Sequence, residues 1–140
     1  MDESMRLAGI ERMRAYVAIV QPLLRLSQWE IYVQFQYPSR EGALAESDTV
    51  RGRWVATIRF GDGHFLDAPQ DQRNTVIHEL LHVVTANERR VVWESYECPL
   101  PGDKSIAWKA YDFEQEMVMD HLATVLAPFL PLPPSMPSAS

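Results

Sequence analysis

Two histidines four residues apart, with a glutamate directly after the first, are the residues of this chain best suited to chemistry. His78, Glu79 and His82 form the pattern H-E-x-x-H. In a helix of 3.6 residues per turn, positions four apart lie about 40° from each other, so both imidazoles can reach one metal ion. Glu79 projects about 100° away from His78, where its carboxylate can take a proton from a water on the metal. The spacing predicts a zinc site with Glu79 as the general base.

The residues around this pattern predict a buried helix. Asp71 or Asn74 can cap its start, and Asn87 can stop it. Neutral imidazoles and a carboxylate on a packed helix need partners that offset their lost solvation, and a metal ion is such a partner. The alternative is a solvated helix edge with ordinary surface contacts. The expected apolar surface consists of Val76, Ile77, Leu80, Leu81, Val83 and Val84.

A third ligand is expected from a second helical segment, residues 108–126. Catalytic zinc usually has three protein ligands and one place left for water. Glu116 and Asp120 lie one turn apart in this segment, so Glu116 can bind the metal while Asp120 accepts the ring N–H of a ligating histidine. The apolar face predicted for the other side consists of Phe113, Met117, Val118, Leu122, Val125 and Leu126.

The two helices together resemble the gluzincin metallopeptidases, in particular the small phage-type minigluzincins. The H-E-x-x-H helix is followed by a helix with the pattern E-x-x-x-D at Glu116 and Asp120. Residues 116–128 also resemble the end of the ImmA/IrrE-type regulatory proteases. Both resemblances imply that His78, His82 and Glu116 bind zinc and that Glu79 is the base. They further imply that Asp120 orients a histidine ligand.

Other candidates for the third ligand remain open. Glu114 lies closer to the apolar face of the second helix, and His121, Asp112 and Glu97 are within reach in the sequence. A histidine ligand at His121 would make the chain similar to the SprT-like group, which typically acts on DNA-bound proteins and carries basic or zinc-ribbon extensions. The chain has a net charge of −6 and one cysteine, which favours Glu116.

Composition limits the organisation of the chain. We expect one domain in residues 1–127, because 140 residues with 46% hydrophobic content suffice for one core, followed by a flexible proline-rich tail in residues 128–140. The acidic balance argues against nucleic-acid or anionic-membrane partners. The absence of a signal-like or membrane-spanning apolar segment and the single Cys98 favour a cytoplasmic location. The oligomeric state is not predicted.

The remaining pattern predicts an α+β fold with a small zincin-like domain. Apolar residues from Leu7 to Leu24 recur at helical spacing up to a bend or end near Pro22. Strands are expected at residues 29–37 and 53–60, in a short, mainly antiparallel sheet, while residues 43–48 are ambiguous. In the resembling families, the strand before the zinc helix is a sheet edge along which extended substrate binds antiparallel. That edge would be residues 54–60, unless this strand is interior and paired on both sides.

The stretch between the two helices, residues 88–107, is expected to be an irregular loop beside the site. A donor that stabilises the oxyanion is also needed, and the sequence does not rank Tyr96, Tyr111, His64 and Arg90 for this role.

The function predicted from these residues is zinc-dependent hydrolysis of peptide bonds in a protein or peptide substrate. The alternative is a regulatory or binding module whose zinc site cleaves one dedicated partner or nothing. Structural zinc usually has four protein ligands, often including cysteine, so two histidines and one glutamate favour the enzyme.

Overall fold

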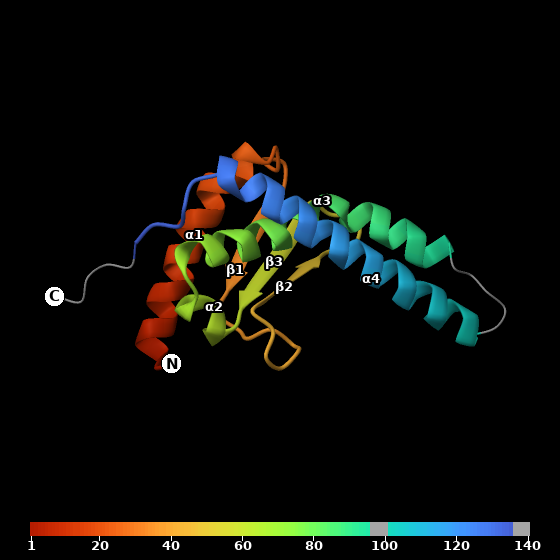
Figure 1. Cartoon of the computed structure of the whole chain (residues 1–140), viewed down its shortest axis with the longest axis horizontal. Helices are drawn as coiled ribbons and strands as arrows, with labels where there is room; N and C mark the ends of the chain where they lie inside the picture. Colours follow the sequence, from red (N-terminus) through yellow and green to blue (C-terminus); the bar gives the residue numbers. More distant parts are fainter. Residues whose placement is uncertain (96–100, 136–140) are drawn as a thin grey trace.

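The computed structural model describes residues 1–95 and 101–135, and for residues 101–105 it describes only the course of the helix. The element order is α1 (Glu3–Leu23), β1 (Glu30–Gln34), β2 (Ala45–Thr49), β3 (Val55–Phe60), α2 (Asp62–Leu66), α3 (Pro69–Ser95), α4 (Pro101–Leu126) and the 3-10 turn η1 (Ala127–Phe129). Figure 1 shows α1 and α3 crossing the sheet, with α4 lying along α3. The described part is thus a small α+β domain, as expected from the sequence.

The sheet has the order β1-β3-β2, and two expectations about it are wrong. It is mixed, because β1 runs parallel to β3 while β2 runs antiparallel to it. The strand before the H-E-x-x-H helix, β3, is central and paired on both sides, so the edge next to α3 is β2. The reason is composition: β3 buries Ala56, Ile58 and Phe60, whereas β2 has the polar sequence AESDT, which suits a solvated edge.

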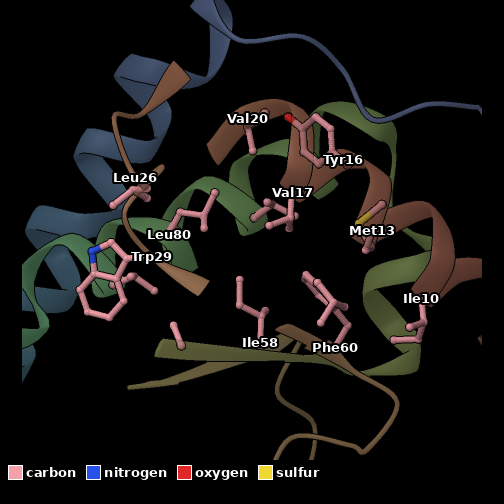
Figure 2. Close-up of a cluster of buried hydrophobic side chains, with 14 residues drawn as sticks. Ile10, Met13, Tyr16, Val17, Val20, Leu26, Trp29, Ile58, Phe60 and Leu80 are labelled. Atoms are coloured by element: carbon pink, nitrogen blue, oxygen red, sulfur yellow. The ribbon is translucent and has the colours of Figure 1, made fainter. Parts of the chain in front are cut away.

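One face of the sheet carries the main core. In Figure 2, Ile58 and Phe60 of β3 lie below side chains of α1, with Leu80 of α3 beside them. The opposite face is polar, since Arg59 of β3 forms ion pairs with Glu46 at 3.3 Å and Asp48 at 2.6 Å. A sheet with one buried and one solvated face explains why β3 alternates along its length.

Helix α1 follows the predicted pattern at its centre. The Asp2 side chain caps its start by accepting a hydrogen bond from the Met5 N–H at 2.8 Å, and the helix ends at Leu23, next to Pro22. Ile10, Met13 and Val17 are buried, whereas Leu7 is half-exposed. The helix therefore covers the sheet with one face, as its spacing indicates.

Helix α3 is longer than expected. Asn87 lies within the helix and does not stop it, and the chain stays helical to Ser95. The predicted loop at residues 88–107 is therefore mostly helix, with α4 beginning at Pro101. Contacts with α4 explain the extension, because Arg89 and Trp93 both pack against that helix. Tyr96, Glu97 and Cys98 lie outside the described residues.

Helix α4 packs antiparallel on α3, and its predicted apolar face is wrong. Ile77 and Leu81 of α3 contact Met119, Ala123 and Ala127, where the small alanines allow the helices to approach closely. Of the side chains on the predicted apolar face, Leu126 is partly buried against this cluster, and the others are exposed: Phe113 (64%), Met117 (56%), Val118, Leu122 and Val125. In the part of the chain that the structure describes, no helix has the length and apolar character to cross a membrane.

The segment after α4 is bound to the body of the domain by its backbone. The Tyr16 hydroxyl donates to the Pro131 carbonyl at 2.7 Å, Arg73 donates to the Leu130 carbonyl at 3.1 Å, and Arg12 donates to the Pro134 carbonyl at 3.2 Å. Residues 130–134 therefore lie across α1 and α3.

A buried arginine joins α1 to the C-terminal ends of β1 and β3. Arg6 is 1% exposed and donates to the carbonyls of Phe35 at 2.7 Å and Phe60 at 2.9 Å, and to the Asp62 carboxylate at 2.8 Å. The centre of its guanidinium lies 3.6 Å from the Tyr37 ring centroid. One cation thus satisfies carbonyl groups at the ends of two strands, of which that of Phe60 is buried.

Replacement of this arginine tests its contribution. We expect Arg6→Met to lower the free energy of unfolding by about 1–3 kcal/mol, because it leaves the buried Phe60 carbonyl without its partner and removes the bonds to Phe35 and the half-exposed Asp62. Urea denaturation followed by circular dichroism measures the change, with the exposed Arg53→Met as the matched control. A loss no larger than that of the control would show that this network contributes little.

A buried histidine makes stability depend on pH. His64 lies against the Met13 sulfur at 3.2 Å and stacks on Phe60, and burial, assisted by the charge of Arg12, lowers its pKa from 6.5 to about 3. Below about pH 6.5, His64 binds a proton in the unfolded chain but stays neutral in the folded chain. The free energy of unfolding should therefore fall as pH drops from about 6.5 toward 3, by at most about 1.4 kcal/mol per unit.

Denaturation between pH 7 and pH 4.5 measures this dependence. His64→Leu should have a flatter profile than the wild type, whereas replacement of the exposed His121 by leucine should leave the slope unchanged. Equal slopes for the wild type and His64→Leu would contradict the assignment.

Candidate metal centre

Three side chains from two helices converge on one point. His78 and His82 of α3 have their Nε2 atoms 2.9 Å apart. Glu116 of α4 places one carboxylate oxygen 3.3 Å from His78 Nε2 and the other 3.2 Å from His82 Nε2. Among the described residues this is the one group of three or more histidine, cysteine, aspartate or glutamate side chains that could hold a metal ion, with all donor atoms within 4.8 Å of one another.

The donor set fits a small divalent cation. Bonds of about 2.0–2.2 Å in tetrahedral geometry separate ligand atoms by roughly 3.3–3.5 Å, close to the distances found here. Two imidazole nitrogens at 2.9 Å need a proton or a cation between their lone pairs. Imidazole and carboxylate donors match zinc and several other transition metals, so the geometry indicates a possible metal site without selecting the ion.

Asp120 contacts the other side of His78. Its carboxylate lies 2.9 Å from His78 Nδ1, one turn after Glu116 on the same helix. An Nδ1–H that donates to Asp120 leaves the Nε2 lone pair free toward the cluster. Asp120 therefore orients the ring and determines which nitrogen faces the candidate metal position.

The charges of the site favour a cation. Hydrogen bonds with His78 and His82 hold the pKa of Glu116 well below its usual range. Burial alone would lower the pKa of His78, but the bond with Glu116 and the charges of Glu79, Glu116 and Asp120 outweigh burial and raise it. The excess negative charge that draws a proton to His78 would also attract a metal ion.

Glu79 is buried beside this cluster. Its side chain is 7% exposed, and burial raises the pKa of its carboxyl group against the opposing effects of Ser47 and the two histidines. The Ser47 hydroxyl donates to the Glu79 backbone carbonyl at 3.3 Å, which connects β2 to α3 at the level of the cluster. A carboxylate with a raised pKa is suited to accept a proton and return it.

The alternative ligands lie elsewhere. Glu114 and His121 are exposed on α4 and are not part of the cluster. Asp112 forms an ion pair with Arg89, and Glu97 lies outside the described residues. Of the residues considered for the third ligand, the structure thus brings only Glu116 to the two histidines within its described part.

A cleft of about 790 Å³ opens in front of the cluster, lined by β2 and the facing sides of α3 and α4. Backbone hydrogen bonds join residue 44 to 61 and residue 50 to 55. In an antiparallel pair every second residue bonds to the neighbouring strand, so within β2 the residues whose backbone groups bond to β3 are 46 and 48. The backbone N–H and C=O groups of Ala45, Ser47 and Thr49 consequently face away from β3. These groups can pair with an added strand.

Arg89 was missed by the sequence analysis. It donates to Gln115 Oε1 at 2.8 Å, pairs with Asp112, and lies 3.9 Å from Glu116. The signal was present, because positions 78 and 89 are three helical turns apart and only about 20° from each other. The position was hidden by the expectation that the helix stops at Asn87.

The residues considered as oxyanion donors are distributed differently. Arg90 lines the cleft, whereas His64 is buried in the main core and Tyr111 packs on Trp108. Tyr96 lies outside the described residues. The structure brings Arg90 and Arg89 to the cleft, but not His64.

Comparison of the chain with protein-family models, with curated proteins and with solved structures yields no match. The site is therefore interpreted from its own geometry.

Metal titration tests the cluster. We expect His82→Ala and Glu116→Ala to abolish tight binding of zinc, and Asp120→Ala to weaken it by about 10–100-fold, because a ligating histidine loses its orienting partner. Competition with a chromophoric chelator measures the affinities, and the exposed His121→Ala is the control. Unchanged affinity in Glu116→Ala would remove this glutamate from the site.

Proposed function

We propose that this protein is a zinc-dependent metallopeptidase with a zincin-like arrangement of helix and edge strand. The observation that carries the proposal is the convergence of His78, His82 and Glu116 beside the buried Glu79. The resemblance of the two helices to the gluzincin metallopeptidases agrees with it. The described geometry is that of a possible metal site, and the choice of zinc and of a catalytic reaction belongs to the proposal.

His78, His82 and Glu116 would hold the metal, and Asp120 would keep His78 in the ligating tautomer. Zinc, when bound, would lower the pKa of a water molecule and polarise the scissile carbonyl. Glu79 takes the proton from the attacking water and then transfers it to the leaving amine. Its raised pKa suits both steps, because the group must bind the proton and release it within one turnover.

The substrate in this proposal is an extended peptide added to β2. The outward backbone groups of Ala45, Ser47 and Thr49 supply hydrogen bonds of the strand-addition type. Ser47 lies next to Glu79, so the bound chain would pass the metal position in the middle of this edge. The substrate edge expected at β3 is thereby reassigned to β2.

An open enzymatic site is favoured over a closed structural one. The cluster has three donor residues within the described part of the chain and borders the cleft, whereas structural zinc is usually enclosed by four protein ligands. A general base buried next to the ligands has no use in a purely structural site.

A single substitution tests the reaction. We expect Glu79→Gln to bind zinc as tightly as the wild type but to lose about 10²–10⁴-fold in peptide hydrolysis, because glutamine cannot take the proton. Cleavage of unfolded casein and chelator competition measure the two properties. Glu88→Gln, on an exposed position of the same helix, is the control.

Two results would overturn the proposal. Full activity in Glu79→Gln would assign the base elsewhere. Zinc binding without cleavage of any unfolded protein or peptide by the wild type would instead support the regulatory or binding module.

A further inference from the structure

One end of the cleft is aromatic. Three of the four tryptophans of the chain line the cleft: Trp93 and Trp108, together with Trp29, which is 6% exposed and belongs to the main core. Trp93 of α3 and Trp108 of α4 meet edge to face with ring centroids 4.7 Å apart, and Arg89 lies over Trp108 at 5.1 Å. Trp93 is 43% exposed, so this end of the cleft keeps accessible aromatic surface.

Two arginines at this end already have acidic partners. Arg89 pairs with Asp112 and donates to Gln115. Arg51, at the end of β2, pairs with Glu94 of α3 at 2.8 Å. Because the guanidinium groups of Arg89 and Arg51 are neutralised, they offer little to an acidic side chain. Arg90, which also lines the cleft, is the arginine that could attract one, whereas the tryptophans offer surface to a planar apolar side chain.

The direction of β2 determines which part of a bound peptide reaches this end. Ser47 contacts Glu79, whereas Arg51, four residues later, contacts Glu94, so β2 and α3 run in the same general direction. Antiparallel pairing is the more stable mode of strand addition. A peptide bound in this way places its N-terminal residues beside Arg51 and the tryptophans, and its C-terminal residues beside Ala45.

We propose that the end of the cleft formed by Trp29, Trp93 and Trp108 is a subsite for an aromatic side chain on the N-terminal side of the scissile bond. Trp108 lies about 12 Å along α4 from Glu116, and Trp93 about 16 Å along α3 from His82, at a rise of about 1.5 Å per residue. Because a strand advances about 3.3 Å per residue, this side chain lies about four or five residues from the cut. The inference rests on the proposed peptidase function and specifies its substrate class.

Mapping of cleavage sites tests the subsite. Zinc-loaded protein is incubated with unfolded casein, and mass spectrometry identifies the bonds that are cut. We expect phenylalanine, tyrosine and tryptophan to be enriched within about five residues before the cut. Trp108→Ala should reduce the preference for phenylalanine over alanine in kcat/KM by about tenfold, whereas Trp108→Phe should retain it.

Phe113→Ala is the matched control, because Phe113 lies on the same helix as Trp108, is 64% exposed and does not line the cleft. Its preference should equal that of the wild type. Circular dichroism and zinc affinity identify variants that have lost the fold, and Trp93→Leu provides a second test if Trp108→Ala does not fold.

Binding measurements separate failure of the subsite from failure of the peptidase function. The probes are end-blocked alanine hexapeptides with one phenylalanine at each position in turn, titrated into zinc-loaded Glu79→Gln. Tighter binding of phenylalanine peptides, lost in Trp108→Ala, supports the subsite even if the wild type cuts nothing. Cleavage without aromatic preference, or with preference for acidic residues or for aromatic residues after the cut, overturns the subsite alone. If the protein neither cleaves nor binds any of these peptides, both the subsite and the peptidase function are overturned.

Discussion

The close antiparallel packing of α3 on α4 is the constraint on which the candidate site depends. Ala123 and Ala127 let α4 approach Ile77 and Leu81, and this fixes the height of Glu116 relative to His78 and His82. A shift of one helical turn, about 5.4 Å, would move Glu116 out of reach of both rings. The candidate metal centre is therefore a property of the helix pair rather than of the H-E-x-x-H pattern alone.

The sheet contributes the other wall of the cleft. Its apolar face is covered by α1 and α3, and β2 is the outer strand on the side of α3, with one edge not paired in the sheet. The contact between Ser47 and the Glu79 carbonyl places this edge beside the buried carboxylate. Arg6 holds α1 on the sheet, because it donates hydrogen bonds to the carbonyls at the C-terminal ends of β1 and β3. Packing and candidate chemistry are thus coupled through few contacts.

Polar residues account for much of the difference between sequence and structure. The apolar side chains of residues 113–125 led to the wrong prediction of the buried face of α4. The face that is buried against α3 carries Gln115, Met119 and Ala123. Acidic partners for His78 and Arg89 outweighed burial of Phe113 and Met117. The same networks carry α3 past Asn87, where a local stop signal gives way to contacts between helices.

The sequence by itself determined the α+β class and the helix that carries H-E-x-x-H, and it favoured Glu116 and Asp120 among the ligands left open. The spacing of the two histidines, and that of Glu116 and Asp120, follow directly from 3.6 residues per turn within each helix. Only the tertiary structure decided that Glu116 meets the histidines, that β2 is the edge next to α3, that β1 lies parallel to β3, and that Arg89 and the tryptophans share the cleft with the candidate metal centre. Strand order and helix facing depend on contacts between distant segments, and local periodicity carries no information about them.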